Sequence, residues 1–248
     1  MASEPRPDEQ LVSRAVEAGL SSQLDAAENV SVDVRTDLLH AVQGQVDSVA
    51  VSGQGVVMQG LTVQDMEVQT DRIQVNPLSI LFGKVEFNQP VNAAARMTLT
   101  ESDLDRALNS DLVLNQIPPL HLSVDGEKVI VSLQPPLKVR LPGNNRIGLD
   151  GNARLQEPTG TRQLGFSVVI IPRTDDRPAL LESFNCQPGT GMSIAFTIAL
   201  MQKLQEILDL PYLQIDGMAF RIKNLDVHAG SVAIQTEARV HRIPDLQS

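Results

Sequence analysis

The sequence predicts an α+β fold in which a strongly curved and twisted antiparallel β-sheet wraps around one or two long helices. Two observations predict this fold. Short segments that alternate apolar and polar residues fill most of the 248-residue chain, as half-buried strands do. One segment, residues 192–209, is instead apolar on every side over its first half, and a helix of that kind has to be enclosed. The surrounding strands would enclose it.

The N-terminal part of the chain predicts one helix followed by strands. Residues 1–8 are polar and contain proline, which is typical of a disordered lead. Residues 10–28 follow a helical pattern, and alternating valines from residue 30 onward predict strands. Residues 61–75 change phase within one alternating run, as happens at the β-bulges that bend strands. A curved sheet is the expected result.

The second half predicts a capped helix, hairpins and the apolar helix. Thr100 precedes a short helical segment, and Asp103 stands three residues later, as in a variant capping box. Asp125-Gly126 lies between two alternating segments and predicts a hairpin turn. Pro211 ends the apolar helix, and two or three more strands follow. No linker divides the chain, so we expect a single domain over residues 9–243 with a tail at 244–248.

Composition excludes several classes of function. The net charge of −10 repels phosphate backbones, and a chain with one Tyr and no Trp lacks stacking platforms, so no nucleic-acid partner is expected. The N-terminus lacks a signal-peptide pattern, and the longest apolar run is too short to cross a bilayer. We therefore expect a soluble cytoplasmic protein whose contact with a membrane is peripheral and transient.

No combination of residues in the sequence indicates catalysis. The four histidines are isolated from one another and from other metal-ligating residues, so no metal site is predicted. Cys186 is the only cysteine and has no basic neighbour, which indicates an incidental thiol. No nucleophile elbow, metalloprotease motif or phosphate loop is present. We predict no catalytic residue and no cofactor, and we disfavour an enzyme acting on a glycolipid because its polar groups are missing.

Several segments carry a resemblance to a known family. The helix end SSQLDAAENVSVDVRTD is followed by QGQVDSVAVSGQGVVM and LTVQDMEVQTDRIQVNPLS, and the element MTLTESDLDRAL matches a recurring strand-to-helix signature. The chain resembles the LmeA-like phospholipid-binding family from Leu11 to Ile243, and it is similar in length to cyanobacterial members. The resemblance implies lipid binding and a tubular lipid-binding architecture, a long helix cradled in a curved sheet. Mycobacterial members carry export signals, which this chain does not show.

Two hypotheses about function follow. The first is a non-enzymatic carrier or sensor that holds the acyl chains of a phospholipid or another lipid in an apolar groove between the sheet and the helix at 192–209. The candidate groove residues are Ile194, Phe196, Ile198, Met201, Leu204 and Leu208, and the candidate groove entrance is Leu81 and Phe82. The alternative for each groove residue is plain core packing. The second hypothesis is a structural or assembly module that binds a protein partner through the apolar patch around Phe82.

Overall fold

The computed structural model describes residues 7–21, 24–36, 39–40, 43–58, 60–75, 87–115, 117–172, 177–186, 193–208, 213–215 and 218–241. Contacts within the chain divide it into two compact units. The first unit comprises Met1–Thr98, Pro211–Lys223 and Ala233–Ser248, and the second comprises Leu99–Leu210 and Asn224–Val232. A single domain over residues 9–243 stays a prediction. The expected lead and tail lie outside the described residues, apart from Pro7 and Asp8, which begin the first helix.

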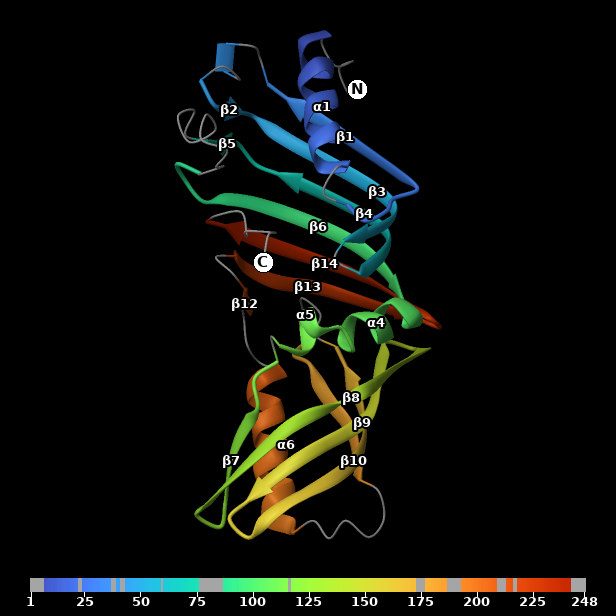
Figure 1. Cartoon of the computed structure of the whole chain (residues 1–248), viewed down its shortest axis with the longest axis vertical. Helices are drawn as coiled ribbons and strands as arrows, with labels where there is room; N and C mark the ends of the chain where they lie inside the picture. Colours follow the sequence, from blue (N-terminus) through green and yellow to red (C-terminus); the bar gives the residue numbers. More distant parts are fainter. Residues whose placement is uncertain are drawn as a thin grey trace. The chain divides into compact units, whose positions relative to one another are not determined.

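The first unit is built on a seven-stranded sheet with the strand order β1-β3-β4-β6-β14-β13-β12 (Figure 1). Its strands are β1 (Asn29–Arg35), β3 (Ser48–Met58), β4 (Leu61–Thr70), β6 (Val91–Thr100), β12 (Leu213–Ile215), β13 (Met218–His228) and β14 (Ser231–Val240). The boundary with the second unit falls inside β6, β13 and β14. Helix α1 (Pro7–Ser21) packs against β1, and β2 (Gln45–Val46) pairs separately with β5 (Ile73–Gln74).

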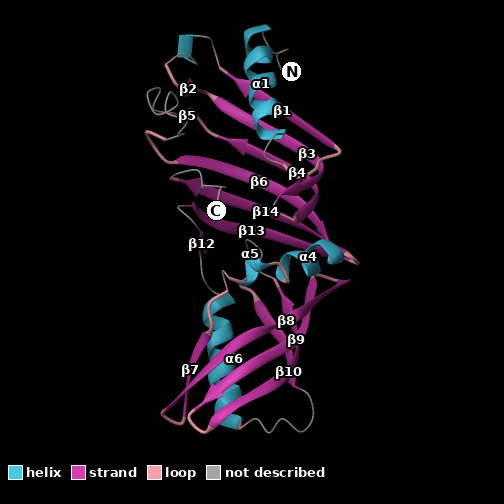
Figure 2. Ribbon diagram, viewed as in Figure 1, coloured by secondary structure: helices cyan, strands magenta, loops and turns pink. Residues whose placement is uncertain are grey.

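The second unit contains a five-stranded antiparallel sheet with the strand order β11-β10-β9-β8-β7 and three helices (Figure 2). Its strands are β7 (Leu120–Val124), β8 (Glu127–Gly143), β9 (Arg146–Glu157), β10 (Gly160–Ile171) and β11 (Leu180–Cys186), and its helices are α4 (Glu101–Leu108), α5 (Asp111–Leu114) and α6 (Ile194–Leu208). The hairpin predicted at Asp125-Gly126 is confirmed, because both residues have positive φ and join β7 to β8. The capping box of Thr100 and Asp103 is confirmed at the start of α4.

The five-stranded sheet is curled around α6. A flat sheet of five strands would be about 19 Å wide, since neighbouring strands lie about 4.8 Å apart. A helix with its side chains is only about 10 Å in diameter. Nevertheless α6 packs against both edge strands, β7 and β11, and Figure 1 shows the strands crossing α6 and curving around it. The expectation of a strongly curved sheet around a helix is therefore confirmed for this unit.

The expectation of one or two long helices is wrong. The described part of the chain is mostly β with a few short helices, and α1 and α6 have 15 residues each. The helical pattern predicted over residues 10–28 ends at Ser21, because the next segment pairs with β3 instead. Asp25 N–H donates to the carbonyl of Val57 at 2.9 Å, and Glu28 N–H donates to that of Gln54 at 3.0 Å. Backbone pairing with the sheet replaces the last turns of the helix.

Candidate functional site

The inner side of α6 is part of the core of the second unit. Phe196 and Leu200 are 2% and 4% exposed and pack with buried residues of β7, β8, β9 and β10. Leu204 packs against the same cluster. The guanidinium of Arg162 lies 6.0 Å from the centre of the Phe196 ring, within range of a cation–π contact. At these positions side chains fill the space between α6 and the five-stranded sheet.

The outer side of α6 carries an exposed apolar stripe. Ile194 is 80% exposed and Ile198, one helical turn later, is 52% exposed, while Met201 is half-buried. Enclosure of the whole helix is therefore not observed, because the curled sheet covers the side of α6 that faces its strands and leaves this stripe accessible. Leu81 and Phe82 lie outside the described residues, as does the side chain of Leu208. The assignment of the groove and its entrance stays a prediction.

The seven-stranded sheet carries a second extended apolar surface, which we call the sheet face. Residues directly opposite one another on neighbouring strands project from the same side of a sheet. Two such rows cross the four strands β1, β3, β4 and β6 in register. The rows are Val32, Val51, Val68 and Ala95, and Val30, Gly53, Met66 and Met97. Apart from Gly53, every side chain in both rows is aliphatic or a methionine.

Burial differs between members of the sheet face, because Val32 on β1 is buried and the row members on β4 and β6 are not. Val32 and Val34 are 5% and 1% exposed under α1, whose Ser13 hydroxyl accepts a hydrogen bond from Val34 N–H at 2.9 Å. The apolar residues of the rows on β4 and β6, such as Val68 and Met97, are only half-buried. The residues that alternate with them, including Asp65, Glu67, Gln69 and Arg96, are exposed and polar. The sheet thus has one polar side and one apolar side that remains partly accessible.

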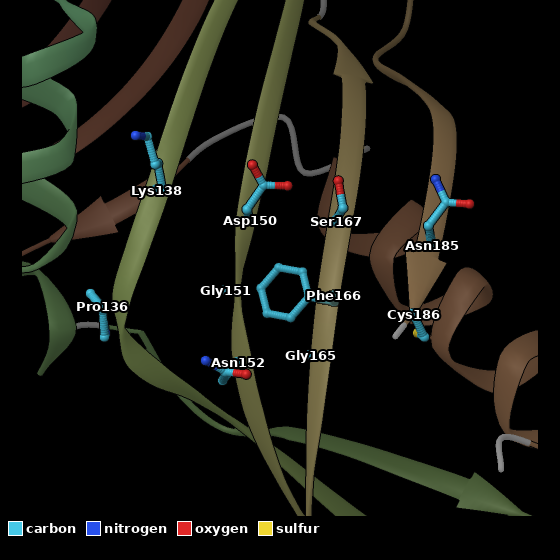
Figure 3. A pocket seen from close by; sticks show the side chains of 10 residues that line it. All are labelled: Pro136, Lys138, Asp150, Gly151, Asn152, Gly165, Phe166, Ser167, Asn185 and Cys186. Carbon is cyan, nitrogen blue, oxygen red and sulfur yellow. The ribbon is translucent and has the colours of Figure 1, made fainter. Parts of the chain in front are cut away.

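A pocket of about 440 Å³ lies on the five-stranded sheet (Figure 3). Its lining residues are Pro136, Lys138, Asp150, Gly151, Asn152, Gly165, Phe166, Ser167, Asn185 and Cys186. Figure 3 shows the Phe166 ring lying between Gly151 and Gly165. A Cβ atom on Gly151 would come within 2.6 Å of Leu137 Cδ2, so a side chain at this position would force the buried Leu137 to shift. The mixed polar lining suits a small polar group better than an acyl chain.

An ion pair holds the carboxylate of this pocket in its charged form. Asp150 binds Arg140 through both carboxylate oxygens, and Arg140 Nη2 also donates to the Ser167 hydroxyl at 3.2 Å. The pKa of Asp150 lies below its ordinary value, first because of the hydrogen bond from Arg140 and further because of Ser167 and the nearby positive charges. Partial burial opposes this shift in the pKa. The carboxylate is therefore ionised and paired with Arg140 at neutral pH, which is the behaviour of a structural ion pair.

The described residues give little support for a metal site, a reactive cysteine or a membrane-spanning helix. Among them, no group of three histidine, cysteine or acidic residues is placed to hold a metal ion. Cys186 packs against the core of the second unit, and burial raises the pKa of its thiol, which favours the unreactive protonated form. None of the helices described is long and apolar enough to cross a membrane.

The rows of the sheet face could not be read from the sequence. Alternation of apolar and polar residues was visible in each strand, but the rows form only when β1, β3, β4 and β6 pair in register. For the pocket, the only indication in the sequence was the pair of glycines, Gly151 and Gly165, which lie on neighbouring strands.

Comparison with known protein families finds that the LmeA-like phospholipid-binding family matches residues 6–237. No curated protein matches the chain.

Proposed function

The chain belongs to the LmeA-like phospholipid-binding family, and on that premise we propose that it carries a phospholipid without catalysing a reaction on it. The acyl chains lie on the sheet face, along the half-buried residues of β3, β4 and β6. The observation that carries this proposal is the pair of apolar rows that cross four strands without a charged side chain. An acyl chain needs such a surface because it offers no group for a polar residue to bind.

The sheet face can supply useful affinity. Each methylene removed from water contributes about 0.8 kcal/mol. Ten covered methylenes would contribute about 8 kcal/mol before the cost of ordering the chain, which is the scale of a micromolar dissociation constant. Because the rows on β4 and β6 are half-buried rather than buried, a bound chain would still remove water from both itself and the protein.

The space between α6 and the five-stranded sheet is a weaker candidate for the acyl chains. Phe196 and Leu200 occupy it, and a lipid there would have to displace them from the core. We instead assign the exposed stripe of Ile194 and Ile198 to transient contact with the membrane from which the lipid is taken. The contact would be apolar and local, since the net charge of −10 does not favour anionic headgroups.

A matched pair of substitutions tests the proposal. Val68→Asp places a carboxylate on the sheet face, and Gln69→Asp places the same group one residue later, where the side chain is exposed on the polar side. We expect native mass spectrometry of protein purified from cells to show bound phospholipid on the wild type and on Gln69→Asp, and little on Val68→Asp. Circular dichroism would establish that each variant is folded.

Two results would contradict the proposal. Wild-type protein that never carries phospholipid, whether purified from cells or incubated with phospholipid vesicles, would contradict lipid carriage. A folded Val68→Asp variant that carries as much phospholipid as Gln69→Asp would contradict the sheet face as the binding surface.

A further inference from the structure

The pocket of Figure 3 lies in the second unit and has no part in the carriage of acyl chains on the sheet face. Its volume of about 440 Å³ is in the range of pockets that bind small molecules. An ion pair and several other polar side chains line it, whereas the sheet face is apolar. Any ligand of this pocket must therefore differ in chemistry from an acyl chain.

Strand register brings the polar side chains of the pocket to one side of the five-stranded sheet. Residues directly opposite one another on neighbouring strands project from the same side of a sheet. One polar row crosses four strands in register, and Figure 3 shows its side chains at one level. The row is Lys138, Asp150, Ser167 and Asn185. Polar groups from β8, β9, β10 and β11 thus meet in one place.

A glycine opens the space beside this polar row. Gly165 lies two residues before Ser167 and opposite Asn152, so it belongs to the next row on the same side of the sheet. Because Gly165 has no side chain, the space above it stays open between Asn152 and the polar row. The hollow is therefore present before any ligand binds.

The pocket carries a surplus of positive charge. Asp150 is already bound by Arg140 through both carboxylate oxygens. The hydrogen bond from Arg140 is the main cause of the lowered pKa of Asp150, and the charge of Lys138 adds to it, so Lys138 lies near the same carboxylate. None of the described residues forms an ion pair with Lys138. In a chain with a net charge of −10, two cations beside one carboxylate favour an anionic ligand at this place.

Two amides complete the polar lining. Asn152 and Asn185 are exposed, and within the described ranges neither side chain has a hydrogen-bond partner. A side-chain amide presents both donors and an acceptor, so it can bind a hydroxyl group whichever way that group is oriented. Hydroxyl groups of a ligand would thus find partners beside the cation that attracts its negative charge.

From these observations we propose that the pocket binds a phosphorylated polyol. The phosphate lies at the ammonium group of Lys138, which supplies up to three donors as a point charge. The hydroxyl groups bind the amides of Asn152 and Asn185. Glycerol 3-phosphate has this chemistry, and the headgroup of phosphatidylglycerol presents it at a membrane surface. The same pocket can therefore take the free compound or the headgroup, and the test distinguishes the two sources.

The test is a titration of the full chain followed by chemical shifts in nuclear magnetic resonance spectra. The probes are glycerol 3-phosphate, glycerol and inorganic phosphate, each added alone. The variants are Lys138→Gln, Asn185→Ala and Lys128→Gln. Lys128 is the matched control, because it is an exposed lysine of the same strand that does not line the pocket. Vesicles of phosphatidylglycerol are then added to the complex with glycerol 3-phosphate as a competitor.

We expect saturable binding of glycerol 3-phosphate to the wild type and to Lys128→Gln, with shifts in the amide resonances of β8 to β11. Lys138→Gln removes the surplus charge and should weaken this binding by about 10-fold. Asn185→Ala should weaken it by about 3- to 10-fold and leave the binding of inorganic phosphate unchanged, because inorganic phosphate keeps Lys138 and has no polyol. All three positions are exposed, so each variant should remain folded.

Displacement of glycerol 3-phosphate by the vesicles would assign the pocket to the lipid headgroup, and retention would assign it to the free compound. Wild-type protein without saturable binding of glycerol 3-phosphate would overturn the proposal. Equal weakening by Lys138→Gln and Lys128→Gln would overturn the pocket as the site, and glycerol bound as tightly as glycerol 3-phosphate would overturn the role of the charge. None of these readouts involves the sheet face, so failure here and failure of lipid carriage are distinguishable.

Discussion

Truncating Phe196 to alanine tests whether the inner side of α6 is core or lipid-binding surface. The ring is 2% exposed and packs within the main buried cluster of the second unit. Core substitutions of Phe by Ala destabilise proteins by about 3–5 kcal/mol, because apolar contacts are lost and a cavity remains. Loss of the ring beneath the Arg162 guanidinium removes about 0.5–1 kcal/mol more. We therefore expect the free energy of unfolding of this unit to fall by about 4 kcal/mol.

Ile194→Ala is the matched control on the same helix. Ile194 lies two residues earlier and is 80% exposed, so its truncation should change the free energy of unfolding by less than about 0.5 kcal/mol. Hydrogen exchange measured by mass spectrometry suits the comparison, because peptides from α6 and β7–β11 report the opening of this unit separately from the other. A cost below about 1 kcal/mol for Phe196→Ala, together with loss of bound phospholipid, would refute the assignment to the core.

Three further substitutions test the packing and the ion pairs. Asp103→Ala removes the capping box of α4 and a carboxylate that is 1% exposed. We expect the free energy of unfolding in urea to fall by about 2–4 kcal/mol. A fall of less than about 0.5 kcal/mol would contradict the role of the cap. Asp150→Asn breaks the ion pair with Arg140. The pKa of Asp150 is lowered in the folded protein, so the ion pair contributes at most about 1 kcal/mol to the free energy of unfolding, and this contribution is complete above about pH 5. The contribution disappears as the pH falls through the lowered pKa. The stabilities of wild type and variant should therefore converge in acid unfolding curves. A stability difference that grew toward low pH would contradict this sign. Gly53→Ala places a Cβ atom 2.5 Å from Val56 Cγ2 and should lower the melting temperature through a loss of about 1–3 kcal/mol, whereas an unchanged melting temperature would show that β3 can shift.

Local patterns in the sequence predicted the local elements well. The helix expected at residues 192–209 is present as α6, and the capping box and the Asp125-Gly126 hairpin occur where they were predicted. Each of these depends on residues close together in the chain. The extent of burial on α6 was predicted less well, since the exposure of Ile194 and Ile198 depends on how far a five-stranded sheet can curl around a helix.

The candidate binding surface depends on contacts that sequence patterns do not specify. Val32 and Ala95 belong to one row only because three separate strand pairings bring them onto the same side of the sheet.

Photo-crosslinking with a phospholipid that carries a diazirine in its acyl chain tests the central claim most directly. The labelled lipid is loaded from vesicles, the complex is irradiated, and the modified peptides are identified by mass spectrometry. Binding on the sheet face predicts that the label concentrates on β3, β4 and β6, with modification at residues of the two rows such as Val68 and Met97. Label confined to α6 and the strands of the five-stranded sheet, with none on these rows, would contradict the account.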